Sequence, residues 1–528
     1  MKEKIVIGSR GSDLALWQAH FVKSELESKE NCDVEIKIIK TQGDIIQNVS
    51  FDKMEGKGFF TKEIEEALLN REIDVAVHSH KDLPTTHPDK LKIAAVSYRE
   101  NPAELLLMRN ESFEQKHTFF LKKNAIVGTS SGRRISQMNA LRPDFEFKVL
   151  RGNVPTRINK LRNGEYDAIV LAAAGVHRLK LDIEDLVHYE MYPENIIPAP
   201  AQGVLALQIH EENTRVESLL SSFNNADVQQ LIHAERDVLR RFDGGCQLAL
   251  GSYAFKHENK YRLFSCWSPD KVSAPLYLRL RGNSLEGMSE KAYSVLSSAP
   301  EKLKQKHVYV TKNEDEAIKF NETLRTYCKD YTLSSHIQIK HLPSLKETAL
   351  YTDYVIFTSK HAVESFFDQG NTLADTVNII SVGKVTAKSL IAHGFKAHII
   401  PNKQSQEGIV EWIKQNDPKR NYTYISGNMG LTTIEESVEK VERINVYETT
   451  ILPITDLQKN NLEEATDIVF TSPSNVTACK DLSINWAEKT IYAYGKITGQ
   501  IIKEYFGVSP IVLQEPSADE LISELIQH

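Results

Sequence analysis

Two arginine-rich segments of the chain have the residue types and the positions that anion binding requires. Each follows a short apolar run and opens a helical pattern, so that backbone N–H groups, hydroxyls and guanidinium groups would converge at the start of a helix. Guanidinium groups bind carboxylates and phosphates through paired hydrogen bonds. Either segment alone could be structural, but two at equivalent junctions predict a site for a polyanion. The candidate residues are Ser131, Arg133, Arg134, Arg151 and Arg157.

The distribution of charge supports a local anion site. The chain of 528 residues has a formal net charge of -7, whereas residues 116–162 contain eleven Lys or Arg side chains and only two acidic ones. A solvated basic face would have the same composition. Nucleic acid is a weaker candidate, because few aromatic residues interleave with these charges.

Two further positions could carry chemistry. Lys81 and Asp82 follow an apolar strand pattern at 73–78, where a carboxylate could move a proton or stabilise a developing cation. The same two residues could simply form an ion pair. Cys246 follows two glycines that permit a tight turn and could present the thiol to a cleft, although a free cysteine is more often buried and inert.

The elements around these residues predict layered α/β structure. Apolar runs of strand length alternate with helical periodicity over the first 210 residues, which is typical of largely parallel sheets. In such sheets ligands bind beyond the carboxyl ends of the strands, where the polar clusters fall. Residues 227–242 and 284–297 then predict helices that flank three strands, a small α+β unit. We place the main boundary at residue 302.

The C-terminal part contains an internal repeat. The sequence VIFTS at 355–359 recurs as IVFTS at 468–472, and GKVT at 383–386 recurs as GKIT at 495–498. Both copies end in a serine followed by a helical pattern. The spacing predicts a duplicated α/β domain with two lobes facing a cleft.

Several classes of protein are disfavoured by the sequence. No apolar stretch reaches the ~18–20 residues of a membrane span, and the first residues lack the apolar run of a signal peptide. The five cysteines are scattered and form no CxxC pair, so that neither a disulfide framework nor a zinc site is indicated. We expect a cytoplasmic protein without a metal.

Residues 4–300 resemble hydroxymethylbilane synthase, also called porphobilinogen deaminase. The matching segments, in family order, are GSRGSDLALWQA, KMEGKGFFTKE, DVAVHSHKDLP, IVGTSSGRR, LRGNVPTR, EYDAIVLAAAG, PAQG and GGCQLALGSYA. The resemblance implies an enzyme that joins porphobilinogen units head to tail and releases ammonia. It also implies two domains like periplasmic binding proteins and a small α+β domain, with approximate bounds of 1–98 with 197–215, 99–196 and 216–302.

The resemblance also implies roles for individual residues. Cys246 becomes the anchor of a dipyrromethane cofactor, held as a thioether, and Asp82 becomes the catalytic carboxylate beside Lys81. His80 stands where the family commonly has Met, and we expect its side chain to be solvated. The residues that would bind the acetate and propionate groups of cofactor and substrate are Arg10, Ser12, Lys81, Ser131, Arg133, Arg134, Arg151 and Arg157.

An active-site loop and a hinge of the family also have counterparts here. The loop residues are Lys53, Lys57 and Phe60, and the hinge residue, counted with those that bind the cofactor, is Gln202.

Residues 303–528 resemble uroporphyrinogen-III synthase through VIFTSKHAV, VGKVTA, VFTSPSNV, YGKIT and the final SADEL helix. The resemblance implies a two-domain cleft, with repeat units at 355–413 and 468–526. It also implies an enzyme that closes a linear tetrapyrrole, loses water and inverts ring D. A tyrosine often implicated in the loss of water falls at Ala478. The residues that would line the cleft are Thr358, Ser359, Thr386, Ser472, Ser474 and Thr498.

Together these features predict a bifunctional enzyme that converts porphobilinogen into hydroxymethylbilane and then into uroporphyrinogen III. Its expected partners are these small molecules, with no nucleic acid and no membrane, and the sequence does not specify an oligomeric state. Two alternatives stay open. One is a small-anion binding protein with duplicated lobes, which the GGCQ loop and the missing secretion signal oppose. The other is a deaminase with a non-catalytic binding or regulatory module, which Ala478 favours.

Overall fold

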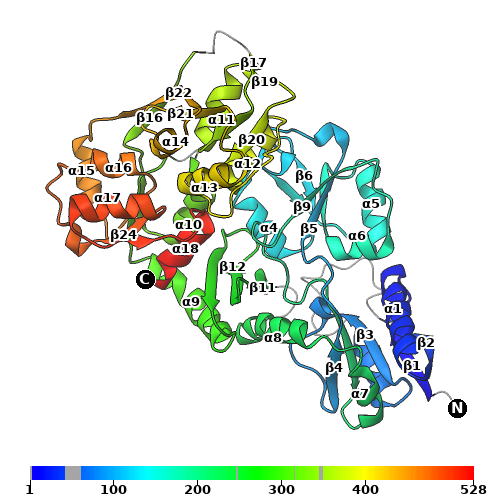
Figure 1. Ribbon diagram of the computed structural model, residues 1–528. Helices are drawn as coiled ribbons and strands as arrows, with labels where there is room; N and C mark the ends of the chain where they lie inside the picture. Colours follow the sequence, from blue (N-terminus) through cyan, green and yellow to red (C-terminus); the bar gives the residue numbers. More distant parts are fainter. Residues whose placement is uncertain (1–2, 42–60, 245–247, 314–315, 344–348) are drawn as a thin grey trace. The chain divides into compact units, whose positions relative to one another are not determined.

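A computed structural model describes residues 3–41, 61–244, 248–313, 316–343 and 349–528. The chain forms two compact units, whose elements are labelled in Figure 1. Unit 1 comprises Met1–Val308, Glu314–Tyr331 and Ile511–His528, and unit 2 comprises Tyr309–Asn313 and Thr332–Pro510. Four residues of the predicted sites lie outside the described residues, namely Lys53, Lys57, Phe60 and Cys246.

The first sheet of unit 1 has the strand order β2-β1-β3-β10-β4. Strand β1 pairs in parallel with β2 and β3, whereas β10 pairs antiparallel with β3 and β4. One face packs on the apolar stripe of helix α1, where Ala19, Val22 and Leu26 are buried. The bounds are β1 (Glu3–Ser9), α1 (Asp13–Lys29), β2 (Cys32–Ile38), α3 (Lys62–Leu69), β3 (Val75–Ser79), β4 (Leu91–Val96) and β10 (Leu205–His210).

The second sheet of unit 1 has the order β7-β6-β8-β5-β9. Strand β6 runs parallel to β7 and β8, and β5 runs antiparallel to β8 and β9. The sequence predicts largely parallel sheets, but both are mixed because each takes in strands that run against the βαβ direction. The bounds are β5 (Glu104–Met108), β6 (Ile126–Gly128), α4 (Gly132–Asn139), β7 (Glu146–Lys148), α5 (Val154–Arg162), β8 (Ala168–Ala172), α6 (Ala173–Leu179) and β9 (Val187–Met191).

A three-stranded antiparallel sheet, β11-β12-β13, follows in unit 1. Helix α9 continues through Pro300 to Leu303, beyond the expected end at residue 297. The proline lies in the last turns, where the lost N–H bond and the ring clash are easier to accommodate. The bounds are α7 (Thr214–Leu220), α8 (Ala226–Arg241), β11 (Leu250–His257), β12 (Lys260–Trp267), β13 (Leu276–Gly282), α9 (Met288–Leu303), α10 (Ile318–Tyr327) and α18 (Ala518–Gln527).

The remaining strands form sheets of order β16-β22-β21-β18-β20, β15-β14-β23-β24-β25 and β17-β19. Their strand bounds are β14 (His307–Val310), β15 (Asp330–Leu333), β16 (Ile337–His341), β17 (Ala349–Leu350), β18 (Tyr354–Phe357), β19 (Thr372–Leu373), β20 (Asn378–Ser381), β21 (Tyr422–Gly427), β22 (Val441–Ile451), β23 (Asp467–Phe470), β24 (Thr490–Ala493) and β25 (Ile511–Val512). The helices are α11 (Lys360–Asp368), α12 (Lys384–Ala392), α13 (Gln406–Asn416), α14 (Thr433–Ser437), α15 (Asp456–Glu464), α16 (Pro473–Ala478) and α17 (Lys496–Phe506).

The repeated segments of the sequence form equivalent elements. The two copies of the first motif end β18 and β23, and the serines at 359 and 472 both cap the helix that follows. The serines at 405 and 517 likewise cap α13 and α18. A serine hydroxyl that accepts from a free N–H at a helix start favours the same local fold in both copies.

None of the helices in the described part of the chain is both long and apolar enough to span a membrane.

Candidate functional site

The Lys81–Asp82 pair lies on a short 3₁₀ turn, His80–Asp82, directly after β3. Such a turn has three residues per revolution, so that its three side chains point in different directions. His80 is buried, Lys81 is half-buried and Asp82 is exposed. The turn is held from behind by Arg236, which donates to the carbonyl oxygens of His80 at 3.0 Å and Leu83 at 3.3 Å. The carboxylate of Asp82 is therefore presented by a fixed backbone.

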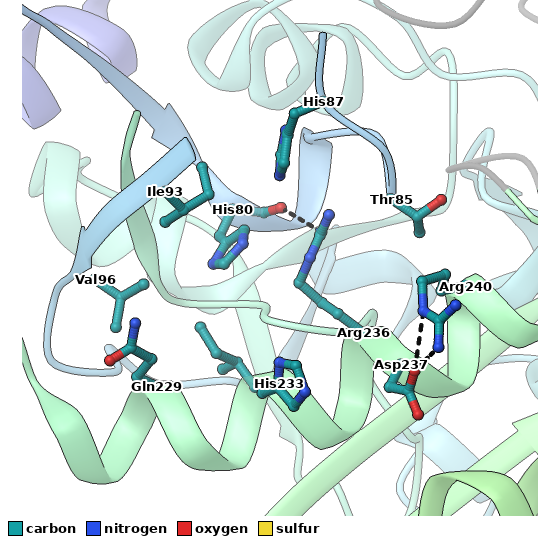
Figure 2. A pocket seen from close by; sticks show the side chains of 11 residues that line it. His80, Thr85, His87, Ile93, Val96, Gln229, His233, Arg236, Asp237 and Arg240 are labelled. Atoms are coloured by element: carbon teal, nitrogen blue, oxygen red, sulfur yellow. Dashed lines mark hydrogen bonds and ion pairs between the residues drawn. The ribbon is translucent and has the colours of Figure 1, made fainter. Parts of the chain in front are cut away.

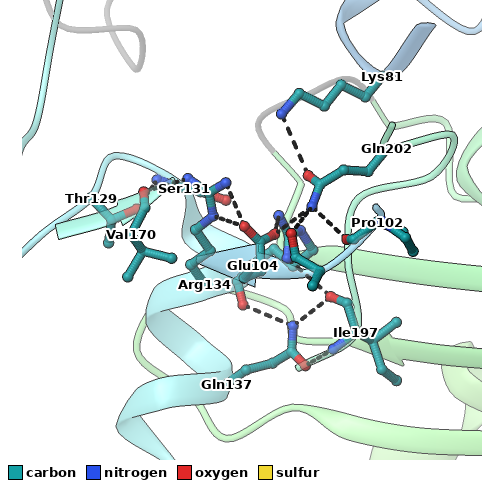
Figure 3. A network of polar contacts seen from close by, with 12 residues as sticks. Lys81, Pro102, Glu104, Thr129, Ser131, Arg134, Gln137, Val170, Ile197 and Gln202 are labelled. Carbon is teal, nitrogen blue, oxygen red and sulfur yellow. Dashed lines mark hydrogen bonds and ion pairs between the residues drawn. The ribbon is translucent and has the colours of Figure 1, made fainter. Parts of the chain in front are cut away.

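A buried glutamate at the start of β5 organises the arginines of helix α4 (Figure 3). Glu104 Oε1 accepts from Arg133 Nη2 at 2.6 Å, and its Oε2 accepts from Arg134 Nε at 2.9 Å. Gln202 Nε2 donates to Glu104 Oε1 at 3.2 Å, and Gln202 Oε1 accepts from Lys81 Nζ at 3.4 Å. We call these five residues the Glu104 network. It connects the first turn of α4 to the Lys81–Asp82 turn.

The charges of the Glu104 network are strongly coupled. Burial alone would raise the pKa of Glu104, but Arg134, Arg133 and Lys81 outweigh burial and lower it to about 2. Burial lowers the pKa of Lys81, and Arg134 adds to this effect, whereas Asp82 opposes it. The carboxylate is therefore ionised at neutral pH, and the cations around it outnumber it.

Arg157 and Arg151 extend this positive region. Arg157 Nε donates to the carbonyl oxygen of Gly152 at 2.7 Å, which holds its side chain at the N-terminal end of α5. Burial lowers the pKa of Arg157 to about 10, with further lowering by Arg134 and Arg151 and an opposing effect of Asp82. A guanidinium whose pKa falls in this way lies near other cations, and a carboxylate ligand would relieve their repulsion.

The other predicted residues of the first half lie at the ends of strands and helices. Arg10 follows β1 and is half-buried. The Ser12 hydroxyl caps α1 by accepting from Ala15 N at 3.4 Å, and half-buried Ser131 precedes α4. The structure thus ties Lys81, Arg133, Arg134 and Gln202 to one network by hydrogen bonds, and links Asp82, Arg151 and Arg157 to it through their charges.

Two members of the site were missed by the sequence analysis. Glu104 opens the apolar run ELLLM, and a carboxylate that begins a buried strand needs a cationic partner, so a signal was present. Gln137 gave no signal, because its role depends on a loop far away in the sequence. Its Nε2 donates to the carbonyl oxygen of Ile197 at 2.9 Å, and Arg133 Nη1 donates to the same oxygen at 3.0 Å.

The expectation that His80 is solvated is wrong, since its side chain is 5% exposed. His80 points to the far side of the turn, into a cavity of about 280 Å³ that is also lined by His87, His233 and Arg236 (Figure 2). Burial lowers the pKa of His80 well below its usual value, and Arg236 and His87 add to the effect. His80 is therefore neutral at physiological pH.

His78, a buried histidine two residues before His80, should make the unfolding free energy depend on pH. Burial lowers the pKa of His78 to about 4, although its bond to Gln208 Oε1 at 3.1 Å opposes the shift. The unfolded chain binds a proton at His78 near pH 6.5 that the folded chain does not, so the unfolding free energy should decrease as pH falls from 6.5 to about 4. Urea unfolding at several pH values in this range gives the slope of the unfolding free energy against pH. His78→Gln should reduce the wild-type slope by up to ~1.4 kcal/mol per pH unit.

The exposed histidine on α1, His20, provides the matched control, since His20→Gln should leave the slope unchanged. Equal slopes for wild type and His78→Gln would show that His78 does not carry this dependence.

In unit 2, the predicted hydroxyl residues of the first repeat lie against tyrosines. Thr358 Oγ1 is 3.2 Å from Tyr424 OH, and Ser359 Oγ is 3.3 Å from Tyr447 OH. Gln406 Nε2 donates to Tyr424 OH at 2.8 Å. Ser359 also accepts from a backbone N–H as the cap of α11. The two hydroxyls therefore make separate polar contacts after β18, one with Tyr424 and one with Tyr447.

The remaining predicted residues of unit 2 differ in exposure. Ser472 caps α16 and Ser474 donates to Met429 Sδ at 3.8 Å, and both are half-buried. Thr386 and Thr498 are buried near the start of α12 and α17.

Two family models match the chain. The first, "Porphobilinogen deaminase, dipyromethane cofactor binding domain", matches residues 5–218. The second, "Uroporphyrinogen-III synthase HemD", matches residues 319–523. The crystal structure of a uroporphyrinogen-III synthetase from Helicobacter pylori is similar at 19% identity, with a TM-score of 0.31 over 42% of this chain and 100% of that one.

Curated relatives extend the first match. A porphobilinogen deaminase from Chlorobium phaeovibrioides is 40% identical over 272 residues, which cover 51% of this chain and 85% of that protein. A porphobilinogen deaminase from Lawsonia intracellularis is 43% identical over 254 residues, 48% of this chain and 80% of that protein. The chain belongs to the porphobilinogen deaminase family, with a uroporphyrinogen-III synthase domain in its C-terminal half, and is a bifunctional enzyme of tetrapyrrole biosynthesis.

Proposed function

We propose that the N-terminal half joins porphobilinogen units into hydroxymethylbilane with release of ammonia. We propose that the C-terminal half closes this product to uroporphyrinogen III with inversion of ring D. One observation carries the first assignment: the Lys81–Asp82 turn lies against a network in which cations outnumber anions. Porphobilinogen brings two carboxylates and an amine leaving group, and this combination suits both features.

The positive residues would recognise the carboxylates. The cations tied to this region outnumber its two carboxylates, Glu104 and Asp82. Charge-assisted hydrogen bonds from guanidinium groups are the strongest contacts that a protein offers to carboxylates. The cations are Lys81, Arg133, Arg134, Arg151 and Arg157.

Asp82 would act on the reacting carbon. The bond between the aminomethyl carbon and nitrogen of porphobilinogen breaks, its electron pair leaves with ammonia, and a cation remains on the pyrrole. A carboxylate close to that cation lowers its energy in the transition state. The cation then forms a carbon–carbon bond with the free α-position of the growing chain, and that position loses a proton, which Asp82 can accept.

The residues fit a dipyrromethane, which carries two carboxylates on each pyrrole and therefore needs a site with excess positive charge. We propose that Cys246 anchors this group and that Arg133, Arg134, Arg151, Arg157 and Gln202 face it. When bound, the group supplies the free pyrrole carbon at which the chain grows. Lys81 and Arg157 would hold their protons more strongly next to its carboxylates.

We also propose the finer architecture that the families imply. For unit 1 this means two domains like periplasmic binding proteins and a small α+β domain. The return of β10 to the first sheet supports a first domain of residues 1–98 with 197–215. For the C-terminal half it means a duplicated two-domain cleft, which the equivalent serine caps of the two repeats support.

The first test is the intact mass of the purified protein. Wild type should be heavier than its sequence by two pyrrole units, because the cofactor is bonded to Cys246. Cys246→Ser should lack this increment and consume no porphobilinogen. Cys328→Ser, at another buried cysteine, should keep it. An active wild-type protein of unmodified mass would contradict the assignment of the cofactor.

The second test is the isomer of the product. Hydroxymethylbilane closes unaided to uroporphyrinogen I, so isomer III formed from porphobilinogen reports a working C-terminal half. Thr358→Ala removes a hydroxyl beside Tyr424 and should shift the product toward isomer I at an unchanged rate of porphobilinogen consumption. Thr352→Ala, at the opposite end of β18, should not shift it. Isomer I alone from wild type would favour a non-catalytic C-terminal module.

A further inference from the structure

The sheet β11-β12-β13 has two different faces. In β13 the even-numbered residues 276–280 are leucines, whereas Tyr277, Arg279 and Arg281 share the opposite face. The strand register places Arg262 of β12 directly opposite Arg281. Like charges at opposed positions destabilise a sheet, so this arginine-rich face needs acidic partners.

Helix α18, at the end of the chain, supplies the acidic partners. Arg279 Nη2 donates to Asp519 Oδ2 at 3.0 Å, and Arg281 Nη1 donates to Glu520 Oε1 at 3.0 Å. Glu515, just before the helix, accepts from Arg279 at 2.9 Å. Asp519 and Glu520 are buried, so their charges are matched by cations rather than by water: by the arginines and, for Asp519, also by Lys319 of α10.

Backbone and apolar contacts complete this docking. The outward N–H group of Arg279, on edge strand β13, donates to Ser523 Oγ at 3.0 Å. Helix α18 therefore covers part of the outer edge of this sheet. The second family model matches residues 319–523, yet α18 packs in unit 1 on β13 and α9. The buried apolar residues of the helix are Leu521, Ile522, Leu525 and Ile526.

The same arginine reaches the loop that supports the deaminase site. Arg279 Nη2 donates to the carbonyl oxygen of Glu194 at 3.1 Å. Three residues later, the carbonyl oxygen of Ile197 accepts from Arg133 Nη1 at 3.0 Å and from Gln137 Nε2 at 2.9 Å. Helix α18 and the Glu104 network are therefore joined through residues 194–197.

The loop lies tightly on the sheet. A Cβ atom at Gly251 of β11 would come within 2.7 Å of the Ile197 carbonyl oxygen and 2.9 Å of Cys266 Sγ. Cys266 pairs directly with Tyr277, on the face of the sheet that carries Arg279, and its sulfur lies beside Gly251 and so beside the loop. Cys266 therefore reports on the space between α18 and Arg133.

We propose that helix α18 is a working part of the deaminase, because it fixes residues 194–197 and through them holds Arg133 against Glu104. The kinetic part of this proposal rests on the proposed function of the first half. In this arrangement Asp519 is a positioning residue: it acts on Arg133 through Arg279 and the loop. The final segment of the chain then serves the first reaction although its sequence belongs to the second family.

The first experiment measures the rate at which Cys266 is alkylated in the full-length protein, read by peptide mass spectrometry. Asp519→Asn removes a charged, buried partner of Arg279 and should raise that rate at least about tenfold by local opening. Cys32, buried in the core of the first sheet, is the internal control and should react no faster. Asp185→Asn, in an exposed ion pair of 2.7 Å with Arg162, is the matched variant and should change neither rate.

The second experiment measures KM and kcat for porphobilinogen in the same variants. Asp519→Asn should raise KM several-fold with less effect on kcat, because Arg133 would contact carboxylates of the substrate or cofactor. Simple destabilisation would reduce the active fraction and lower the apparent kcat at an unchanged KM.

A second variant for the labelling experiment is Ile522→Ala, which removes packing of α18 without removing charge. It should expose Cys266 in the same way as Asp519→Asn.

Unchanged labelling of Cys266 together with an unchanged KM would overturn the proposal. Joint labelling of Cys266 and Cys32 would also overturn it, because α18 would then only stabilise the whole unit. A wild-type protein that consumes no porphobilinogen would refute the proposed function, while the labelling of Cys266 would still decide whether α18 covers this face.

Discussion

Asp82→Asn is expected to lower the turnover of porphobilinogen at least ~100-fold, the usual scale for a group that transfers protons or stabilises charge in the transition state. The amide has the shape of the carboxylate but no negative charge. It can neither stabilise the cation left by ammonia nor accept the proton released when the new bond forms. The side chain is exposed at the end of β3, so the loss should appear in kcat rather than in stability.

The measurement is steady-state consumption of porphobilinogen, together with urea unfolding and intact mass. Asp89→Asn is the matched control, since Asp89 is an exposed aspartate between the same turn and β4, and its turnover should stay within about twofold of wild type. Turnover near the wild-type value in folded Asp82→Asn would make Lys81–Asp82 a structural pair. Loss of the mass increment in this variant would instead assign Asp82 to cofactor assembly.

The positions of the site residues could be predicted from the sequence to a useful degree. Lys81–Asp82 does follow a buried strand, and Arg133 and Arg134 do open a helix at a strand end, because apolar runs, glycines and helix signals are local features. Gln202 does join the Lys81 region. The sequence analysis named four of the five residues of the network, but not Glu104, to which Arg133, Arg134 and Gln202 are bonded.

The contacts of those residues could not be predicted, because they depend on pairings distant in the sequence. Arg133 and Arg134 are bonded to Glu104, about thirty residues earlier, and no local pattern in the sequence indicates that partner. The antiparallel return of β10 also depends on a strand more than a hundred residues after β3. The docking of α18 on β13 has no local signal at all.

The largest expected effect on stability is that of Glu104→Gln. Glu104 is fully buried and accepts charged hydrogen bonds of 2.6 Å and 2.9 Å from Arg133 and Arg134. Glutamine keeps the shape, but removes the charge and turns one end of the side chain into a donor that faces donors. Breaking a buried pair on one side typically costs about 3–5 kcal/mol, because the remaining charge stays buried without compensation. We expect a loss of this size in the unfolding free energy.

The pH dependence of that loss identifies its electrostatic origin. The pKa of Glu104 is lowered from 4.5 to about 2, so its contribution is complete above pH 4.5 and is lost as pH falls toward 2. Urea unfolding of wild type and Glu104→Gln should therefore differ most at neutral pH and converge in acid. Glu165→Gln, at an exposed glutamate just before β8, should stay within about 0.5 kcal/mol of wild type throughout. A loss for Glu104→Gln below about 1 kcal/mol, or a difference that persists in acid, would mean that packing rather than this carboxylate holds the two arginines in place.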